Sequence, residues 1–486
     1  MKTTPRRSFL KKTGFGVSAF YIARSSWAQS SPGDTIHTAV IGFRSRGRGH
    51  ISAITGLKHK GVALSALCDV DSKVLAGGVA NLEKKDIKVK SYTDLRRVFE
   101  DKDIDAVTIA TPNHWHALAA IWACQAGKDV YVEKPVSHNV WEGRQIVKAA
   151  RKYKRMVQTG TQNRSRLAVR QAVNWIRDGK LGPIRIVRGL CYKLRDSIGL
   201  TDGPHPVPPN INYDLWCGPA PLTPPRRNSK RYGPVHYDWH WFWDYGNGDL
   251  GNQGIHQMDI ARWFLGENAL SPRVWSIGGR VGYRDDAETP NTQIVYHGYE
   301  KAPLIFEVRG LPRAAKQRGT SLYMGTNVGV IVHCEGGHLI VSNSATVRAY
   351  DTRGKEIKQF TGGGDHFENF FHACRTRRHE DLNADILEGH LSSALCHTGN
   401  ISYRLGQPAD REALVAAVEN DLGGRDALDR MLQHLAANRV SLEEYPLTLG
   451  PNLKMDPRTE RFPGNEAANA LLTRKYRKPF VVPEEV

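Results

Sequence analysis

Residues 36–47 read IHTAVIGFRSRG, an apolar run rich in β-branched residues that ends in a turn containing Gly42 and Gly47. A buried strand that runs through glycines into a helix is the arrangement that cradles a pyrophosphate in dinucleotide-binding folds. Arg44 stands where the pattern G-x-G-x-x-G has its middle glycine, and its side chain narrows the approach of the backbone to a phosphate. The alternative interpretation of residues 42–47 is an ordinary basic turn between a strand and a helix, without a bound phosphate. The predicted phosphate contacts are Gly42, Arg44, Ser45, Arg46 and Gly47.

Further apolar runs occur at residues 62–67, 106–109, 130–132 and 156–158, separated by segments long enough for helices. Strands that alternate with helices at this spacing favour right-handed crossovers and a parallel, doubly wound sheet. We therefore expect a Rossmann-type α/β domain over residues 35–160.

The pattern changes after Gly182 and Pro183, where the strands become longer and alternate with period two, as in residues 304–309. This predicts a second, α+β domain over residues 161–405 with a large, mostly antiparallel sheet. A helix over residues 386–405 would cover this sheet or pack back on the first domain. Residues 406–486 form a C-terminal extension, with helices expected near 413–418 and 427–435.

The N-terminus does not read as part of the fold. Residues 6–11 read RRSFLK, a mildly apolar stretch follows at 15–22, and residues 26–28 read SWA. This order is typical of a twin-arginine export signal, with a disordered basic tail as the alternative. We predict a signal over residues 1–28, cleavage after Ala28, and a periplasmic or exported protein that folds around a cofactor before it meets the export machinery.

The formal net charge of the 486 residues is +19, and the six basic residues of the signal leave +13 after its removal. No nucleic-acid motif accompanies this charge, so a solvated basic surface is the first interpretation and an acidic or sulfated sugar the second. The hydrophobic content of 40% contains no run long enough for stable membrane insertion. Seven widely spaced cysteines without a C-x-x-C pair predict buried free thiols, and no metal site is expected.

Asp69 ends the second predicted strand, about twenty residues after the glycine turn, where a carboxylate accepts hydrogen bonds from a ribose diol. A carboxylate there repels a 2′-phosphate, so Asp69 favours NAD, although the nearby arginines keep NADP open. A helix-capping or surface aspartate is the alternative.

Two motifs end the next strands: residues 111–116 read TPNHWH, and residues 133–135 read EKP. Together they resemble the glucose-fructose oxidoreductase and inositol dehydrogenase (Gfo/Idh/MocA) family over residues 35–405. The resemblance implies that Lys134 contacts the reacting hydroxyl, where its ammonium would stabilise alkoxide character. The further cofactor contacts that it implies are Thr111, Pro112, Asn113, His116, Glu133, Lys134 and Gln162.

Residues 246–259 read GNGDLGNQGIHQMD, which resembles the family's glycine-rich segment and the helix that supplies its proton acceptor. The resemblance makes His256 that acceptor. The family often has aspartate where this chain has Asn252, and an amide can orient the histidine but cannot relay a proton. Asp259, one helical turn later, or Asp249 could replace it. The catalytic set is thus predicted as Lys134, His256, Asn252 and Asp259.

Aromatic residues gather at 192–195 and 237–245, beside charged side chains. Such surfaces stack on the C–H faces of sugars, although a packed interface between the domains is the alternative for some of these rings. The predicted substrate contacts are Tyr192, Arg195, Trp239, His240, Trp241, Asn252 and His256.

These motifs predict an oxidoreductase that transfers a hydride between a sugar or polyol hydroxyl and a tightly bound nicotinamide cofactor, NAD or NADP. Export argues against a freely exchanging cofactor, so the second hypothesis is an NAD-dependent glycoside hydrolase that works through a transient 3-keto sugar, with Tyr192, His240 or Asp249 as the extra base. The third is a non-catalytic sugar-binding protein. The family habit of packing open sheets together implies a homo-oligomer.

Overall fold

The computed structural model describes residues 35–227, 232–342 and 346–486. The predicted export signal lies outside these residues. The N-terminal domain is built on a parallel sheet of order β3-β2-β1-β4-β5-β6, and its strand order reverses between β1 and β4, where such sheets bind ligands. Its strands are β1 Ile36–Ile41, β2 Val62–Cys68, β3 Lys90–Tyr92, β4 Ala106–Ile109, β5 Asp129–Val132 and β6 Val157–Thr159.

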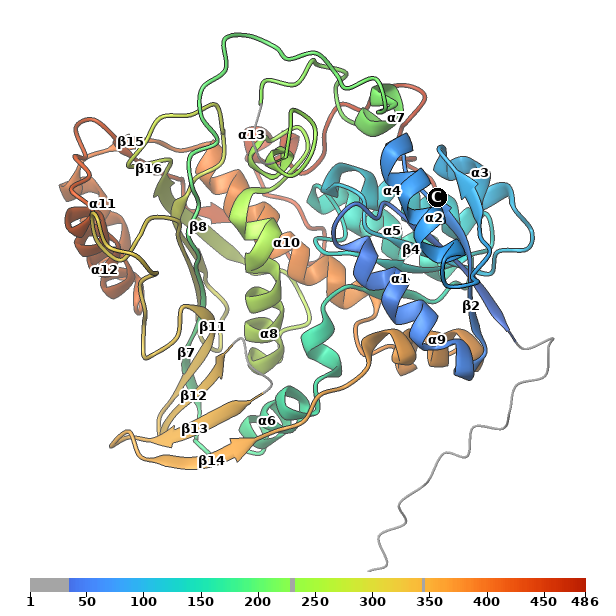
Figure 1. Cartoon of the computed structure of the whole chain (residues 1–486). Coiled ribbons are helices and arrows are strands. Elements are labelled where there is room, and N and C mark those ends of the chain that lie inside the picture. The colour runs from blue at the N-terminus through green and yellow to red at the C-terminus, as the bar shows by residue number, and fades with distance from the viewer. Residues whose placement is uncertain (1–34, 228–231, 343–345) are drawn as a thin grey trace, which may run out of the picture.

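Helices cover both faces of this sheet (Figure 1). Aspartate or asparagine side chains cap several of them; Asp71, for example, accepts from the backbone N–H groups of Lys73 and Val74 at the start of α2. The helices are α1 Gly47–Gly56, α2 Ser72–Glu83, α3 Leu95–Glu100, α4 Asn113–Gln125, α5 Val140–Lys152 and, contributed by the C-terminal half, α9 His366–Thr376.

The second sheet has the order β14-β13-β12-β11-β7-β10-β9-β8-β16-β15, with β17 beside β8. All its pairs are antiparallel except β7 with β10, so the predicted mostly antiparallel sheet is confirmed. Its strands are β7 Ile184–Tyr192, β8 Arg273–Gly279, β9 Thr292–His297, β10 Leu304–Arg309, β11 Val328–Cys334, β12 Gly337–Ser342, β13 Val347–Asp351, β14 Glu356–Phe360, β15 Gln407–Ala409, β16 Leu447–Leu449 and β17 Leu453–Lys454.

Helices α8 and α10 lie between this sheet and the N-terminal domain, and α10 also packs against α5 (Figure 1). Met258 and Leu395 bury their side chains here with the inner face of the sheet. The helical elements of this half are η3 Gln162–Ser165, α6 Leu167–Arg177, α7 Tyr213–Cys217, η4 Asp238–Trp241, η5 Leu250–Gly254, α8 Ile255–Leu265, η6 His379–Asp381, α10 Ile386–Arg404, α11 Arg411–Val418, α12 Gly424–Ala437 and α13 Glu466–Ala470.

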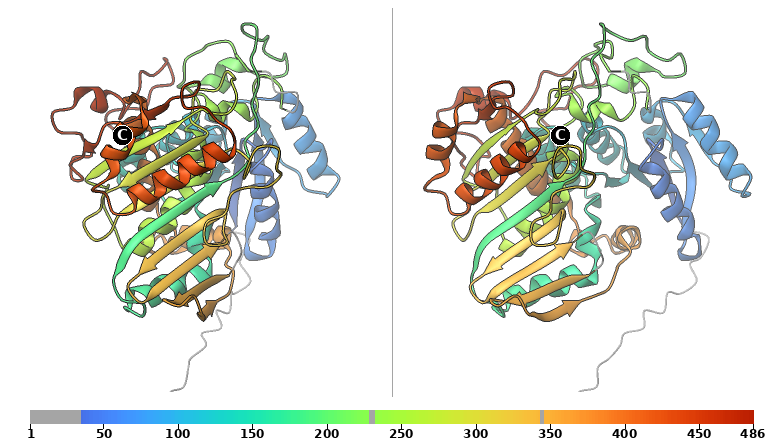
Figure 2. Two further views of the ribbon diagram at one scale, coloured as in Figure 1. Left: turned by 90° about the vertical axis from the view of Figure 1, so that its left-hand side faces the viewer. Right: turned by 60° about the vertical axis from the view of Figure 1, so that its left-hand side comes forward.

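The outer face of the sheet is covered by α11 and α12 of the C-terminal extension (Figure 2). Because both faces are covered, Ile305, Glu307 and Arg309 are buried, although the alternation of β10 suggests one solvent-exposed face. Glu307 and Arg309 are charged, so their burial requires partners of opposite charge.

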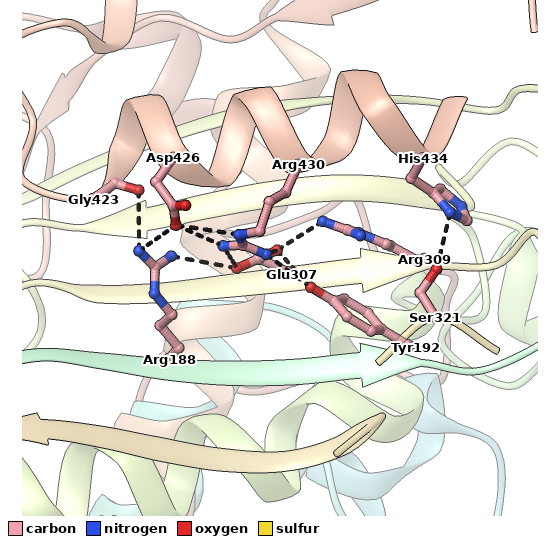
Figure 3. Close-up of polar contacts among 9 residues, drawn as sticks. All are labelled: Arg188, Tyr192, Glu307, Arg309, Ser321, Gly423, Asp426, Arg430 and His434. Atoms are coloured by element: carbon pink, nitrogen blue, oxygen red, sulfur yellow. Dashed lines mark hydrogen bonds and ion pairs between the residues drawn. The ribbon is translucent and has the colours of Figure 1, made fainter. Parts of the chain in front are cut away.

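Glu307 supplies the centre of a buried ionic cluster on this outer face (Figure 3). Its carboxylate accepts two hydrogen bonds of 2.6 Å from Arg430 of α12 and one of 2.7 Å from the hydroxyl of Tyr192. Arg188 and Arg309 lie 3.4 and 3.3 Å from it. Burial alone would raise the pKa of Glu307, but Arg430 holds it below its ordinary value. The cluster fastens α12 to β7 and β10.

The last part of the chain crosses back to the N-terminal domain, and its end lies there in Figure 1. The guanidinium of Arg477 donates to the Asp214 carboxylate (2.6 Å) and to the Gly218 carbonyl (3.0 Å), and Phe480 packs edge-on against Trp115 of α4. All seven cysteines are free, as predicted, and all but Cys334 are buried. Within the described part of the chain, every helix is too short or too polar to cross a bilayer.

Candidate active site

A cleft of about 370 Å³ lies at the carboxyl edge of the parallel sheet, in contact with both halves of the chain. The glycine turn after β1 forms one wall. Gly42 has φ +76°, and a Cβ on Gly47 would lie 2.1 Å from the Gly42 carbonyl oxygen, so both positions require glycine. Arg44, Ser45 and Arg46, the predicted phosphate contacts, line the cleft beside them.

Asp69 lies in the cleft at the end of β2. Its carboxylate accepts hydrogen bonds of 3.0 Å from the backbone N–H groups of Phe43 and Asp71, and only 8% of the residue is exposed. Burial raises the pKa of Asp69 to about 6, while those two hydrogen bonds oppose the shift. A buried carboxylate here, together with the N–H groups that the first turn of α1 leaves without intrahelical acceptors, fits the ribose and pyrophosphate of NAD.

The two motifs at the ends of β4 and β5 form the floor of the cleft, which Thr111, Pro112 and Asn113 line. His116 also lines it, and its ring bonds the carbonyls of Pro135 (2.5 Å) and Thr111 (2.8 Å). This bridge fixes the loop that carries Lys134.

Glu133 also lines the cleft, but its carboxylate is engaged by Arg46 at 2.7 Å and His50 at 3.1 Å. Gln162 donates to Glu133 (3.4 Å) and to the hydroxyl of Tyr131 (3.1 Å) and is not among the residues that line the cleft. Glu133 therefore positions Arg46, and Gln162 supports Glu133.

Lys134 connects the cofactor cleft to the second domain. Its Nζ donates to the backbone carbonyl of Asn252 at 2.6 Å, and Asn252 lies on η5, a π-helical turn that leads into α8. Such turns are frequent at functional sites. Burial lowers the pKa of Lys134; Glu133 opposes this shift, while Arg46 and Lys193 reinforce it.

His256 lies on the first turn of α8, partly exposed, and its Nδ1 is buried with no hydrogen-bond partner among the described residues. Burial, reinforced by the nearby charge of Lys134, lowers the pKa of His256 to about 3. The imidazole is therefore neutral at ordinary pH. Lys134, Asn252 and His256 thus form the one part of the predicted catalytic set that the fold brings together.

A covering segment, residues 204–227 and 232–245, lies beside the edge of the N-terminal domain. Asn210 near its start and His236 near its end both bond the carboxylate of Asp71, at 2.7 and 3.1 Å. A few residues after His236, the rings of Trp239 and His240 stack 3.7 Å apart in the lining of the cleft.

Tyr232, His236 and Tyr237 line the cleft as well, and none of them belongs to the predicted site. Tyr237 has φ +63°, a strained value for a side chain of this size that is common at ligand sites. The sequence signal for these missed residues was Asp71, two residues after Asp69, because a second carboxylate at this edge of the sheet needs a partner.

Three more predicted site residues do not line the cleft. Tyr192 lies on the opposite face of the sheet, bonded to Glu307, because its position in β7 points it away from α8. Asp259 is 1% exposed, and both of its oxygens are bound by Arg164 while Ser392 donates to one of them, so it cannot exchange a proton with His256. Trp241 is buried beneath the guanidinium of Arg195, 5.0 Å from it, and supports that side chain.

Arg195 itself lies outside the cofactor cleft and is bound to Asp249, with Nε–O distances of 2.9 and 3.1 Å. Asp249 directly precedes η5, so this ion pair joins the end of β7 to the turn that carries Asn252. It also occupies the carboxylate of Asp249, which the sequence offered as a substitute proton relay.

Comparison with protein families agrees with this geometry. Residues 36–161 match a family described as "Oxidoreductase family, NAD-binding Rossmann fold", and residues 183–427 match its "C-terminal alpha/beta domain". The chain belongs to the Gfo/Idh/MocA family. The predicted family and fold class are confirmed, and the N-terminal domain is an NAD-binding Rossmann domain of this family.

Inositol 2-dehydrogenase of Salmonella typhimurium is 31% identical over 159 residues, which are 32% of this chain and 46% of that protein. A "Glycosyl hydrolase family 109 protein" of Shewanella pealeana is 33% identical over 159 residues, 31% of this chain and 34% of that protein. The chain thus matches less than half the length of these curated relatives.

Two solved structures share the fold. A levoglucosan dehydrogenase in complex with NADH and levoglucosan has a TM-score of 0.54 at 18% identity, over 74% of this chain and 95% of that one. The WlbA dehydrogenase from Bordetella pertussis, in complex with NADH and UDP-GlcNAcA, has a TM-score of 0.54 at 18% identity, over 74% and 94%.

Proposed function

We propose that this chain is an NAD-dependent oxidoreductase that removes a hydride from, or returns it to, a hydroxyl-bearing carbon of a sugar or polyol. The observation that carries the proposal is the contact of Lys134 with the carbonyl of Asn252, one turn before the neutral His256. This contact brings the ammonium of Lys134 near His256, the proposed proton acceptor, where the NAD-binding domain meets the second domain.

The residues divide the chemistry as follows. The bound nicotinamide supplies the hydride acceptor. Lys134 donates a hydrogen bond to the reacting oxygen and stabilises its developing negative charge. His256, a neutral imidazole, accepts the hydroxyl proton. Asn252 cannot accept a proton, so its part is to hold Lys134 through its backbone carbonyl. Asp69 favours NAD over NADP, since it would repel a 2′-phosphate.

The cofactor is proposed to stay bound between turnovers. The support is the covering segment, which is bonded to Asp71 beside the ribose site and to α4, where the indole Nε1 of Trp115 donates to the carbonyl of Leu215 at 2.9 Å.

A redox-neutral glycoside hydrolase is the second candidate, and the family 109 relatives favour it. Transient oxidation at C3 would acidify the C2 proton, the aglycone would leave, water would add, and the hydride would return. His240 is the additional base that lines the cleft; burial lowers its pKa to about 3, so it too is neutral. Tyr192 cannot be this additional base, because it lies on the outer face of the second sheet.

One experiment separates these activities. NAD-loaded protein is mixed with free sugars and with chromogenic glycosides while nicotinamide absorbance and aglycone release are recorded together. Reduced cofactor without cleavage supports the oxidoreductase, and cleavage without net reduction supports the hydrolase. If neither occurs and native mass spectrometry finds no nicotinamide cofactor, a sugar-binding role replaces both.

Export and assembly belong to the proposal as well. The sequence order of residues 6–28 supports export by the twin-arginine machinery to the periplasm, and fractionation of cells carrying an Arg6→Lys, Arg7→Lys variant tests it. Self-association is proposed from the family habit of packing open sheets together, and Leu322 and Met324, which are 62% and 38% exposed, are candidates for the contact. Light scattering measures the oligomeric state.

A further inference from the structure

Lys193 follows the last residue of β7 and lies on the sheet face that is turned toward α8. On this strand Gly189 faces α8, because a Cβ added there would come within 3.4 Å of a side chain of that helix. Cys191 is buried in the same core. The backbone N–H of Lys193 donates to the carbonyl of Arg309 at 3.0 Å, so the alternation of the strand continues for one more residue. Lys193 therefore extends toward the end of α8 that carries His256.

Several cations converge at this place. Lys193 is close enough to contribute, after burial, to the lowered pKa values of both Lys134 and His240. Arg195 contributes to the shift of His240 in the same direction, and it is anchored two residues farther along the chain by its ion pair with Asp249. Lys134 and Lys193 are thus close to each other on the side of the site where the sugar is proposed to bind, and Arg195 lies next to them in its ion pair with Asp249.

The carboxylates of the same region are already engaged. Glu133 is held by Arg46 and His50, and Asp249 by Arg195. The side chain of Lys193 is exposed, and within residues 35–227, 232–342 and 346–486 no carboxylate pairs with it. Lys193 is therefore a positive charge on this side of the site that no carboxylate of the described residues pairs with.

We propose that the substrate is an anionic sugar, whose carboxylate or sulfate group is bound by Lys193 while its reacting hydroxyl lies against Lys134. A lysine ammonium at the open side of a site is a flexible point charge that suits either oxyanion. This inference rests on the proposed oxidoreductase function and names the substrate class of that site.

The test compares matched sugars on NAD-loaded protein: glucose with glucuronate, galactose with galacturonate, and a neutral with a sulfated monosaccharide. Binding is measured by calorimetry, and turnover by nicotinamide absorbance. We expect the anionic member of at least one pair to have a kcat/KM about tenfold higher, with a preference that shrinks as salt is added. The uronate and sulfate arms identify which oxyanion is recognised.

Lys193→Gln should remove this preference, mainly through a KM about tenfold higher for the anionic sugar. Lys355→Gln, an exposed lysine in the loop between β13 and β14, is the matched control and should keep the preference. Equal kcat/KM for neutral and anionic sugars in the wild type overturns the inference and leaves the oxidoreductase standing. An anionic preference that survives Lys193→Gln also overturns it. If neither neutral nor anionic sugars bind to the protein, and neither reduces the cofactor, the inference and the proposed oxidoreductase function both fail.

Discussion

Lowering the pH through 6 is expected to weaken NAD binding, because Asp69 must be charged to accept both hydroxyls of the ribose. Its pKa is raised by burial from 3.8 to about 6 in the cofactor-free protein. If bound NAD holds the carboxylate in its charged form, one proton is released on binding below pH 6. The affinity should then fall about tenfold between pH 7 and pH 5.

The same shift has a signature in stability. A carboxyl whose pKa is higher in the folded than in the unfolded state binds more protons when folded, so the free energy of unfolding decreases as the pH rises from 3.8 to 6. A pKa shift of that size corresponds to about 3 kcal/mol of unfolding free energy. This stability is lost as the pH rises from 3.8 to 6, and above pH 6 Asp69 adds no further pH dependence. The protein therefore retains a charged Asp69 at neutral pH at the expense of its own stability.

Asp69→Asn tests both statements. Calorimetric titration of NAD from pH 5 to 8 should show weaker binding with little pH dependence, and urea unfolding should show a smaller decrease of stability between pH 4 and 6. Asp71→Asn is the control for the pH dependence: it should weaken binding, because Asp71 holds the covering segment, but it should keep the dependence on pH, because hydrogen bonds from Asn210 and His236 outweigh burial and lower the pKa of Asp71. A wild-type affinity that is constant from pH 5 to 8, or an equal pH dependence in Asp69→Asn, would refute the reasoning.

Four further outcomes are expected. Lys134→Met should lower kcat by about 10² to 10³ with an unchanged near-UV circular dichroism spectrum, since it removes one donor to the developing oxyanion; full activity would exclude the assignment. Asn252→Asp should raise the pKa of His256 by about one unit or more, measured by NMR, because it adds a carboxylate one turn before the ring. Tyr192→Phe should leave kcat/KM unchanged and reduce the free energy of unfolding by about 1 to 3 kcal/mol, because it deletes a donor to the buried Glu307; a changed KM would return Tyr192 to the site. Gly47→Ala should abolish NAD binding or folding, because its Cβ would overlap the Gly42 carbonyl oxygen, and circular dichroism distinguishes the two results.

The parallel sheet could be predicted closely because its strands are buried on both faces and read as continuous apolar runs. Only β3 gave no signal, since Lys90–Tyr92 is three residues long and mostly exposed. Most lining residues of the N-terminal domain were also predictable, because they follow strands and parallel strands end at a common edge. Tyr232, His236 and Tyr237 line the cleft from the covering segment and were not predicted.

The errors came from the second domain. Whether Tyr192 faces the substrate or the outer surface depends on strand register, which a motif does not specify. Asp259 follows His256 by one turn, but Arg164 from η3 directs it into the core, and that partner is 95 residues away in the sequence. The contact of His236 with Asp71 spans 165 residues and leaves no local pattern.

The contacts of the covering segment limit how freely this protein can be recombined. His114 and Trp115 of α4 bond the carbonyl of Trp216, at 2.9 and 3.0 Å, and Asp71 bonds His236. The N-terminal domain, residues 35–160, is therefore not an interchangeable module. A chimaera that took them from a relative without these three side chains would keep its glycine turn and lose the attachment of the segment above it.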